Sequence, residues 1–313
     1  MREAGLAESL TPALDVRDLR VDRAGQRVLE GVSFSVAPGT LTALVGPNGA
    51  GKSSLMRCLA TLQVPSSGSI RFGDLDVLAQ PEALRATLGY LPQDFGVYPR
   101  VSAEDLLDHL AVLKGVAGRG ERRETVEALL RQVNLWEVRK KAVAGYSGGM
   151  RQRFGIAQAL IGNPQLIIVD EPTAGLDPEE RNRFNNLLSA IGEQVVVILS
   201  THIVDDVTDL CPRTAIMVGG RIVESGTPSD LIAALEGRVW QAGIDKTELE
   251  AARSRHAVIA TRLKAGRTVI RVLSDEPGRC PGDGFEPVEA GLEEVYFATL
   301  HRLRAQPAVQ QAA

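Results

Sequence analysis

Cysteine is scarce in this chain of 313 residues. The three present, Cys58, Cys211 and Cys280, are far apart and show no CxxC spacing. This argues against a disulfide framework and against a cysteine metal site, and it fits a reducing compartment. Long hydrophobic runs are missing too, because segments such as residues 195–199 are far shorter than the ~20 residues that cross a bilayer. Any membrane contact is therefore expected to go through a partner.

The chain also has no excess of basic residues. Its 35 lysines and arginines face 39 aspartates and glutamates, which gives a net charge of −4 at pH 7. Proteins that bind nucleic acid neutralise its phosphates with a surplus of lysine and arginine, so nucleic acid is not an expected partner. What the chain does have is 44% hydrophobic residues over a length that suits two domains.

Hydrophobic patterns predict a larger α/β domain first. Alternating β-like segments occupy residues 14–45, and helical stripes follow over 102–162. Two buried strand-like runs come next, separated by a helix that begins near Pro178, which is the pattern of parallel strands with a crossover. The domain is expected to close with a helix that Thr227 caps and that runs through Leu235.

A second pattern after residue 237 predicts a small α+β domain with a final helix from about Gly291. One face of that helix is apolar and is expected to pack on the domain's own strands, with Glu293 and Glu294 outside it. The alternative is that the same face also meets a second copy of the chain. The apolar face consists of Leu292, Val295, Tyr296, Leu300 and Leu303. The predicted parts are a tail (1–13), the α/β domain (14–235), the accessory domain (236–305) and a second tail (306–313).

Residues 46–53 match the phosphate-binding loop pattern GxxxxGK[ST], between a strand-like run and a helical stripe that extends to Leu62. Glycines there let backbone N–H groups curl around phosphate oxygens, and the following helix directs its positive end at them. Lys52 adds a mobile cation, and the Ser53 hydroxyl is placed to ligate Mg²⁺. The predicted nucleotide contacts are Gly46, Pro47, Asn48, Gly49, Ala50, Gly51, Lys52, Ser53 and Ser54.

Two carboxylates follow the buried run at residues 166–169. Asp170 and Glu171 would emerge at the carboxyl edge of a doubly wound sheet, where such folds place their ligands. Hydrolysis needs a group that polarises a water in line with the γ-phosphate. Glu171 is the candidate for this role, beside Asp170 as a metal ligand.

The run Tyr146, Ser147, Gly148, Gly149, Met150, Arg151 and Gln152 adds a second anion cradle. Ser147 is expected to cap a helix whose first N–H groups two glycines leave accessible. This run resembles the signature motif of ATP-binding-cassette (ABC) ATPases, a family that also has a phosphate loop. The resemblance covers residues 14–235. It implies a P-loop cassette with a RecA-like core, an antiparallel β subdomain and a helical subdomain.

Further residues gain roles from this resemblance. Gln93, in the run Leu91, Pro92, Gln93 and Asp94, is similar to the residue that senses Mg²⁺ and contacts the membrane subunit. Asp177 resembles the loop residue that crosses the dimer interface, and His202 resembles the histidine that bonds the γ-phosphate. The implied catalytic residues are Glu171, His202 and Lys52. The implied metal ligands are Ser53, Gln93 and Asp170, and the further nucleotide contacts are Ser147, Gly148, Gly149 and Asp177.

The resemblance also implies partners and a place in the cell. Two copies would enclose ATP head to tail, each between its own phosphate loop and the other's signature. A separate transmembrane permease would use this cycle, with the chain cytoplasmic and peripheral on the inner face of the membrane. Tyr146, Met150 and the run at residues 291–297 are similar to the bacterial branch that exports drugs, peptides or other hydrophobic compounds. Ala24 stands where the family usually has a ring that stacks on adenine, which predicts weak discrimination between ATP and GTP.

Two other functions compete with a transporter subunit. One is a soluble ABC-type ATPase that acts as a clamp or scaffold in iron–sulfur assembly, translation or repair. Such translation factors usually carry two cassettes, and such repair proteins carry long coiled coils, which this sequence lacks. The other is an unrelated phosphate-loop kinase or GTPase, which gives no reason for the run Ser147 to Gly149. The sequence therefore favours a transport ATPase with ATP and Mg²⁺ as cofactors.

Overall fold

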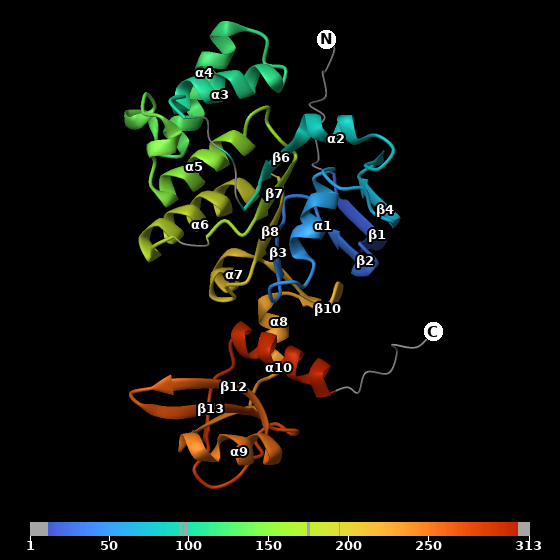
Figure 1. The fold of residues 1–313 in the computed structure, drawn as a ribbon, viewed down its shortest axis with the longest axis vertical. Coiled ribbons are helices and arrows are strands. Elements are labelled where there is room, and N and C mark those ends of the chain that lie inside the picture. The colour runs from blue at the N-terminus through green and yellow to red at the C-terminus, as the bar shows by residue number, and fades with distance from the viewer. Residues whose placement is uncertain (1–11, 94–95, 97–98, 174–175, 194, 306–313) are drawn as a thin grey trace, which may run out of the picture.

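The computed structural model describes residues 12–93, 96, 99–173, 176–193 and 195–305. Its long axis joins a helical part at one end to a smaller α+β unit at the other, with a large α/β body between them (Figure 1). No helix among the described residues has both the length and the apolar character needed to cross a bilayer.

A six-stranded sheet forms the centre of the body. Five of its strands are parallel, and the edge strand β10 pairs antiparallel with β9. Successive residues of β3 face opposite sides, so Leu44 joins one apolar core while Ala43 and Val45 join the other. The strands in sheet order are β10 (Arg221–Gly226), β9 (Arg213–Val218), β3 (Leu41–Val45), β8 (Val196–Thr201), β7 (Leu166–Asp170) and β6 (Leu88–Leu91).

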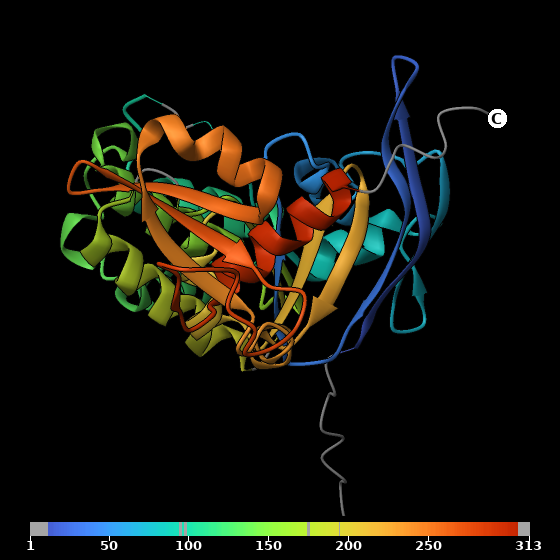
Figure 2. The same cartoon turned by 90° about the horizontal axis from the view of Figure 1, so that it is seen from below.

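An antiparallel sheet covers one side of this body and shares a core with the helix α1 and the central sheet. Figure 2 shows it on the opposite side of the molecule from the helical part. It begins with alternating buried and exposed residues, as expected from the sequence. Its elements are β2 (Gln26–Val36), β1 (Leu14–Arg23), β4 (Ser67–Phe72) and β5 (Leu75–Asp76), with α1 (Lys52–Leu59) and α2 (Pro81–Thr87) beside it.

The helix after the phosphate loop is shorter than predicted. α1 ends at Leu59, because Thr61 takes a left-handed φ of +59° and the Leu62 N–H turns back to the Arg57 carbonyl. Leu62 was expected on the helical stripe, and that expectation is wrong: it lies after the end of α1 and the residue is 62% exposed.

Helices cover the other side of the central sheet. The predicted helical stretch forms α3 and α4, two short 3₁₀ turns and α5, while α6 provides the crossover from Pro178. Their apolar faces belong to one continuous core with the sheet. These elements are α3 (Ala103–Leu113), α4 (Arg119–Gln132), η1 (Trp136–Val138), η2 (Val143–Gly145), α5 (Gly148–Ala159), α6 (Pro178–Gly192) and α7 (Asp205–Leu210).

The smaller unit is a four-stranded antiparallel sheet with one helix on each face. Thr227 caps α8 as predicted, although α8 ends at Ala233 rather than Leu235. Alternation along β13 places Ile270 and Val272 toward α9, and Arg271 and Leu273 toward α10. The elements are α8 (Pro228–Ala233), β11 (Val239–Ile244), η3 (Lys246–Glu248), α9 (Leu249–Arg255), β12 (Ala257–Lys264), β13 (Arg267–Leu273), β14 (Glu286–Pro287) and α10 (Leu292–Ala305). The sheet order is β12-β13-β11-β14.

The final helix α10 does more than cover its own strands. It lies between β12 on one side and α7 and α8 on the other (Figure 1). The expectation that Glu294 lies outside the buried face is wrong: Glu294 is 3% exposed and forms an ion pair with Arg271. Leu292, Val295 and Ala298 belong to the same core as α3 to α8, so this face is covered within the chain.

Candidate nucleotide site

The phosphate-binding loop runs from β3 to α1 and leaves no room for side chains at two of its glycines. A Cβ at Gly46 would lie 2.2 Å from the Met217 carbonyl oxygen. Gly51 combines a φ of +100° with a Cβ position 2.8 Å from the Leu29 side chain. α1 starts directly after Gly51, so its unpaired first N–H groups follow on from the loop. The loop is therefore a preformed anion cradle.

Lys52 lies across this loop. Its Nζ donates to the Gly46 carbonyl oxygen at 2.7 Å and to the Pro47 carbonyl oxygen at 3.3 Å. The same ammonium lies 3.3 Å from Glu171 Oε1. Because the Lys52 side chain is only 5% exposed, these oxygens compensate a buried charge and hold it at the loop.

The two carboxylates are positioned by the neighbouring strand β8. Glu171 has a φ of +50°, which is uncommon outside glycine, and its N–H donates to both the carbonyl oxygen and Oγ of Ser200 at 3.1 Å. Ser200 Oγ in turn donates to Asp170 Oδ1 at 2.5 Å, and Ser53 Oγ donates to the same oxygen at 3.3 Å. One serine thus fixes the backbone of Glu171 and the side chain of Asp170.

Glu171 joins the loop to His202. Its Oε1 faces Lys52, and its Oε2 hydrogen-bonds Nδ1 of His202, which directly follows β8. The Glu171 side chain is buried, whereas the His202 ring is about half exposed. The three residues that the sequence predicts as catalytic therefore form one connected network.

A cavity of about 330 Å³ lies over this network. Gln93 and Ser53 line it together with the loop, so the predicted Mg²⁺ ligands Ser53, Gln93 and Asp170 meet here, with Asp170 reached through Ser53. Hydroxyl, amide and carboxylate oxygens are the donors that Mg²⁺ prefers. The chain's own residues therefore fit a metal-bound phosphate chain.

The signature run forms the N-terminus of α5, as predicted. Ser147 caps the helix by accepting the Met150 N–H at 3.2 Å. Tyr146 anchors the run, since its ring packs edge-on against Phe154 and its hydroxyl donates to the Val138 carbonyl oxygen at 3.0 Å. Burial raises the pKa of Tyr146.

A carboxylate covers this second cradle. Ser147 Oγ donates to Glu180 Oε1 at 3.2 Å, and a Cβ at Gly149 would lie 2.1 Å from the Glu180 carboxyl carbon. Asp177 caps α6 by accepting the Glu180 N–H at 2.8 Å. The residues Ala174 and Gly175 of the same loop lie outside the described part of the chain. Among the described residues, the signature and Asp177 do not border the chain's own phosphate cavity.

Sequence reasoning missed three contributors. Ser200 carries a signal, because it is a polar residue at the end of a buried strand beside the carboxylates. No feature of the sequence indicates a role for Glu180 or Val28. Val28 lines the phosphate cavity, while Ala24 lies in the exposed turn between β1 and β2 with a φ of +49°.

Comparison with known proteins decides the family. The ABC transporter family matches residues 29–174. The uncharacterized ABC transporter ATP-binding protein YxlF of Bacillus subtilis (strain 168) is 32% identical over 92% of this chain and 99% of that relative. The chain belongs to the ABC transporter ATP-binding proteins. The linearmycin resistance ATP-binding protein LnrL of the same organism is 31% identical over 77% of this chain and 79% of LnrL. A solved structure of an ATP binding subunit of an ABC transporter is 31% identical, with a TM-score of 0.63, over 71% of this chain and 92% of the other.

Membership in this family confirms the predicted fold and activity. The chain is an ABC cassette with a P-loop α/β core, and it is an ATP-binding transport ATPase. Its relatives are transport subunits, which supports the transporter over the soluble clamp. The roles of individual residues and the domain boundary at residue 235 stay predictions.

Proposed function

We propose that two copies of this ATPase close head to tail on ATP and Mg²⁺ and thereby power export through a separate permease. The supporting observation is the separation of two anion cradles in one chain. Residues 48–54 of the phosphate loop and α1 line the phosphate cavity, whereas the cradle at Ser147 to Gly149 does not border it. If a second copy places its Ser147 to Gly149 cradle at this cavity, the bound ATP contacts one cradle from each copy.

Each residue then has a physical task. When bound, Mg²⁺ neutralises charge on the phosphate oxygens. Lys52 holds the phosphates by charge, Ser53 and Asp170 supply oxygen ligands, and Glu171 accepts a proton from the attacking water. His202, bonded to Glu171, orients this carboxylate and reaches the rim of the cavity.

The permease is proposed to contact an apolar cavity of about 270 Å³ between the body and the helical part. Leu62 and Leu113 line it and are 62% and 70% exposed. Exposed apolar side chains that gather at one cavity mark interaction surfaces. This contact would hold the chain on the cytoplasmic face of the membrane. Export is proposed from the similarity of Tyr146, Met150 and residues 291–297 to the exporting branch, together with the similarity of the chain to a protein named for linearmycin resistance.

Mixed dimers test the shared site. Lys52→Ala and Ser147→Arg chains are each expected to be inactive alone. In a random mixture half of the dimers are mixed, and each of these has one intact composite site, so about a quarter of the sites are restored. A mixture of Lys52→Ala with Glu171→Gln chains is the control, because both of its sites carry a defect. ATPase activity that returns in neither mixture, although the chains associate, would contradict the head-to-tail arrangement.

A second experiment tests the proposed permease contact at the apolar cavity. Leu62→Asp together with Leu113→Asp is expected to release the chain from membranes that contain its permease. ATPase activity of the free chain should stay unchanged. Leu263→Asp is the matched control, because Leu263 is 77% exposed and lies outside this cavity. If the double variant and Leu263→Asp are retained on the membrane equally, the permease does not contact this cavity.

A further inference from the structure

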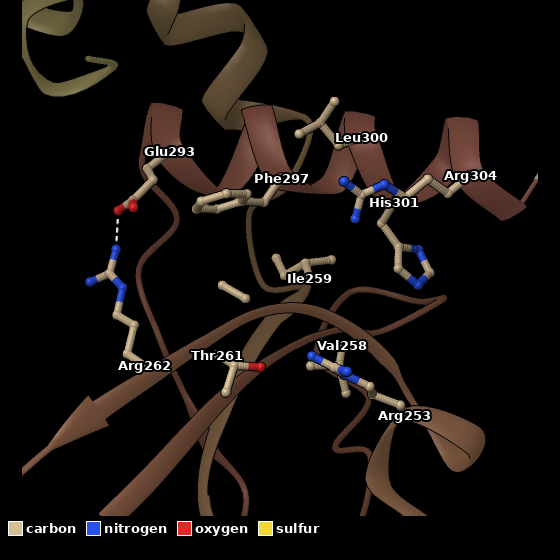
Figure 3. A pocket seen from close by; sticks show the side chains of 11 residues that line it. Arg253, Val258, Ile259, Thr261, Arg262, Glu293, Phe297, Leu300, His301 and Arg304 are labelled. Atoms are coloured by element: carbon tan, nitrogen blue, oxygen red, sulfur yellow. Dashed lines mark hydrogen bonds and ion pairs between the residues drawn. The ribbon is translucent and has the colours of Figure 1, made fainter. Parts of the chain in front are cut away.

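A larger cavity of about 740 Å³ lies in the smaller unit, between α10, β12 and the end of α9 (Figure 3). It is separate from the phosphate cavity, with which it shares no lining residue. Its volume is within the range of about 300–1,000 Å³ that small-molecule sites occupy. Neither the cassette motifs nor the proposed permease contact uses it.

The strand β12 borders this cavity with five consecutive residues, 258–262. The register of β12 against β13 shifts between Val258 and Ala260, so side chains in this segment do not follow a strict alternation between the two faces. The cavity borders this irregular part of β12 and is also lined by Arg253 of α9 and by residues of α10. Within the described residues, β12 pairs with β13 alone, which leaves this edge open.

Charge is distributed unequally along the cavity. At one end Arg262 and Glu293 form an ion pair and neutralise each other. Figure 3 shows His301 and Arg304 on the α10 side and Arg253 across the cavity beside Val258, all away from this ion pair. Arg253 lies 3.1 Å from the exposed Glu250, while no ion pair involves His301 or Arg304 among the described residues. Of the three arginines in the lining, Arg262 and Arg253 thus have carboxylate partners, and the positive charge of Arg304 is left without one among the described residues.

Apolar side chains lie between the two ends. Ile259 is buried, and Phe297 and Leu300 of α10 are half-buried at the cavity wall. Glu293 and Arg304 are eleven residues apart on α10, which corresponds to a length of ~16 Å. The cavity thus offers an apolar middle and one cationic end within the length of a small amphiphile.

We propose that this cavity binds a small amphipathic anion, with its carboxylate at Arg253, His301 and Arg304 and its apolar body on Ile259 and Phe297. Charged residues beside an open strand edge also protect against pairing with other chains. That role needs only charge on the edge strand itself. It does not explain why cationic side chains of α9 and α10 face each other across a cavity with apolar walls.

Binding of decanoate to the full-length chain tests this proposal by calorimetry below the micellar concentration. Decanol is the neutral comparison, because it has the same apolar body without the charge. The triple variant Arg253→Gln, His301→Gln, Arg304→Gln should bind decanoate at least about ten-fold more weakly, since charge-assisted hydrogen bonds are lost. Arg267→Gln is the matched control, because Arg267 is exposed in the same unit but does not line the cavity.

A second variant blocks the apolar middle without a change of charge. Leu300→Trp should also abolish decanoate binding, while unchanged ATPase activity and thermal midpoint show that the chain is folded. Wild-type chain that binds decanoate no more tightly than decanol would overturn the proposal. So would a triple variant with wild-type affinity, or an acidic peptide that displaces decanoate and binds more tightly, which would assign the edge to a protein strand.

Discussion

At the scale of single residues, Glu171 combines an uncommon backbone conformation with a demanding task. Its left-handed φ turns the side chain between Lys52 and His202, and the bonds from its N–H to Ser200 hold it there. Non-glycine residues in this region cost free energy and occur often at functional sites. The sequence predicts that Glu171 follows a strand beside Asp170, but it does not predict the conformation, which depends on a residue of another strand.

Glu171→Gln should leave binding of Mg-ATP intact and lower hydrolysis by ~10²–10⁴-fold, because the amide no longer accepts a proton from water. Turnover of ATP and nucleotide affinity are to be measured on the same preparation. Ser200→Ala is a second comparison: it keeps the Glu171 carboxylate, but it removes one acceptor of the Glu171 N–H and the hydroxyl that donates to Asp170. Wild-type turnover of Glu171→Gln would remove Glu171 from the proposed role.

The signature run gives a second prediction at this scale. Glu180 bonds Ser147 in the single chain, so a phosphate that approaches from a second copy has to displace this carboxylate. Glu180→Ala removes a contact worth about 1 kcal/mol, which should lower the ATP concentration for half-maximal activity by about five-fold. Glu179→Ala is the control, because Glu179 is on the same turn but pairs with Arg183. An equal response of both variants would exclude competition at the signature.

At the scale of elements, the sequence predicts what local patterns determine. The caps Ser147 and Thr227 and the phosphate loop between β3 and α1 carry local signals and are where the patterns place them. Local patterns do not predict the end of α1 or the burial of Glu294. Thr61 has a left-handed backbone conformation, which a threonine in the sequence does not predict. Glu294 is buried because Arg271 of β13 lies opposite, a pairing that no helical pattern shows.

The helix α1 makes a pH dependence testable. Cys58 is fully buried on it, and burial raises the pKa of this thiol from 9.0 to about 11. Between about pH 9 and 11 the thiol ionises in the unfolded chain but stays neutral in the folded one. The unfolded state therefore gains stability, and the free energy of unfolding falls as the pH rises through this window. Below pH 9 Cys58 contributes no such slope.

Comparison with Cys58→Ala isolates this contribution from tyrosines and lysines that titrate in the same range. Urea unfolding at pH 8, 9 and 10 should show a steeper loss of stability in the wild type than in the variant. Cys280→Ala is the control, because Cys280 is exposed. Parallel pH curves for wild type and Cys58→Ala would show that the buried thiol ionises normally.

At the scale of the whole molecule, α10 joins the smaller unit to the cassette. Thr299 Oγ1 donates to Glu224 of β10 at 2.5 Å, and Arg302 approaches the same carboxylate at 3.3 Å. Apolar residues of α8 and α10 belong to one core with the helical part. The sequence pattern places a domain boundary at residue 235. The apolar core crosses this boundary, because it is made of contacts between distant segments that hydrophobic periodicity does not predict.

This shared core predicts the effect of a chain that ends after residue 236. Loss of α10 uncovers α7 and α8 and removes Leu292, Val295 and Ala298 from their common core with Leu231. Burial of one large apolar side chain contributes about 1.5–3 kcal/mol, and 1 kcal/mol corresponds to about 2–4 °C at this size, so the thermal midpoint should fall by several degrees. ATP should still bind and raise the midpoint, because the phosphate loop contacts the other core. A chain that ends at residue 305 is the control, and a midpoint equal to that of the control would show that the cassette is stable without α10.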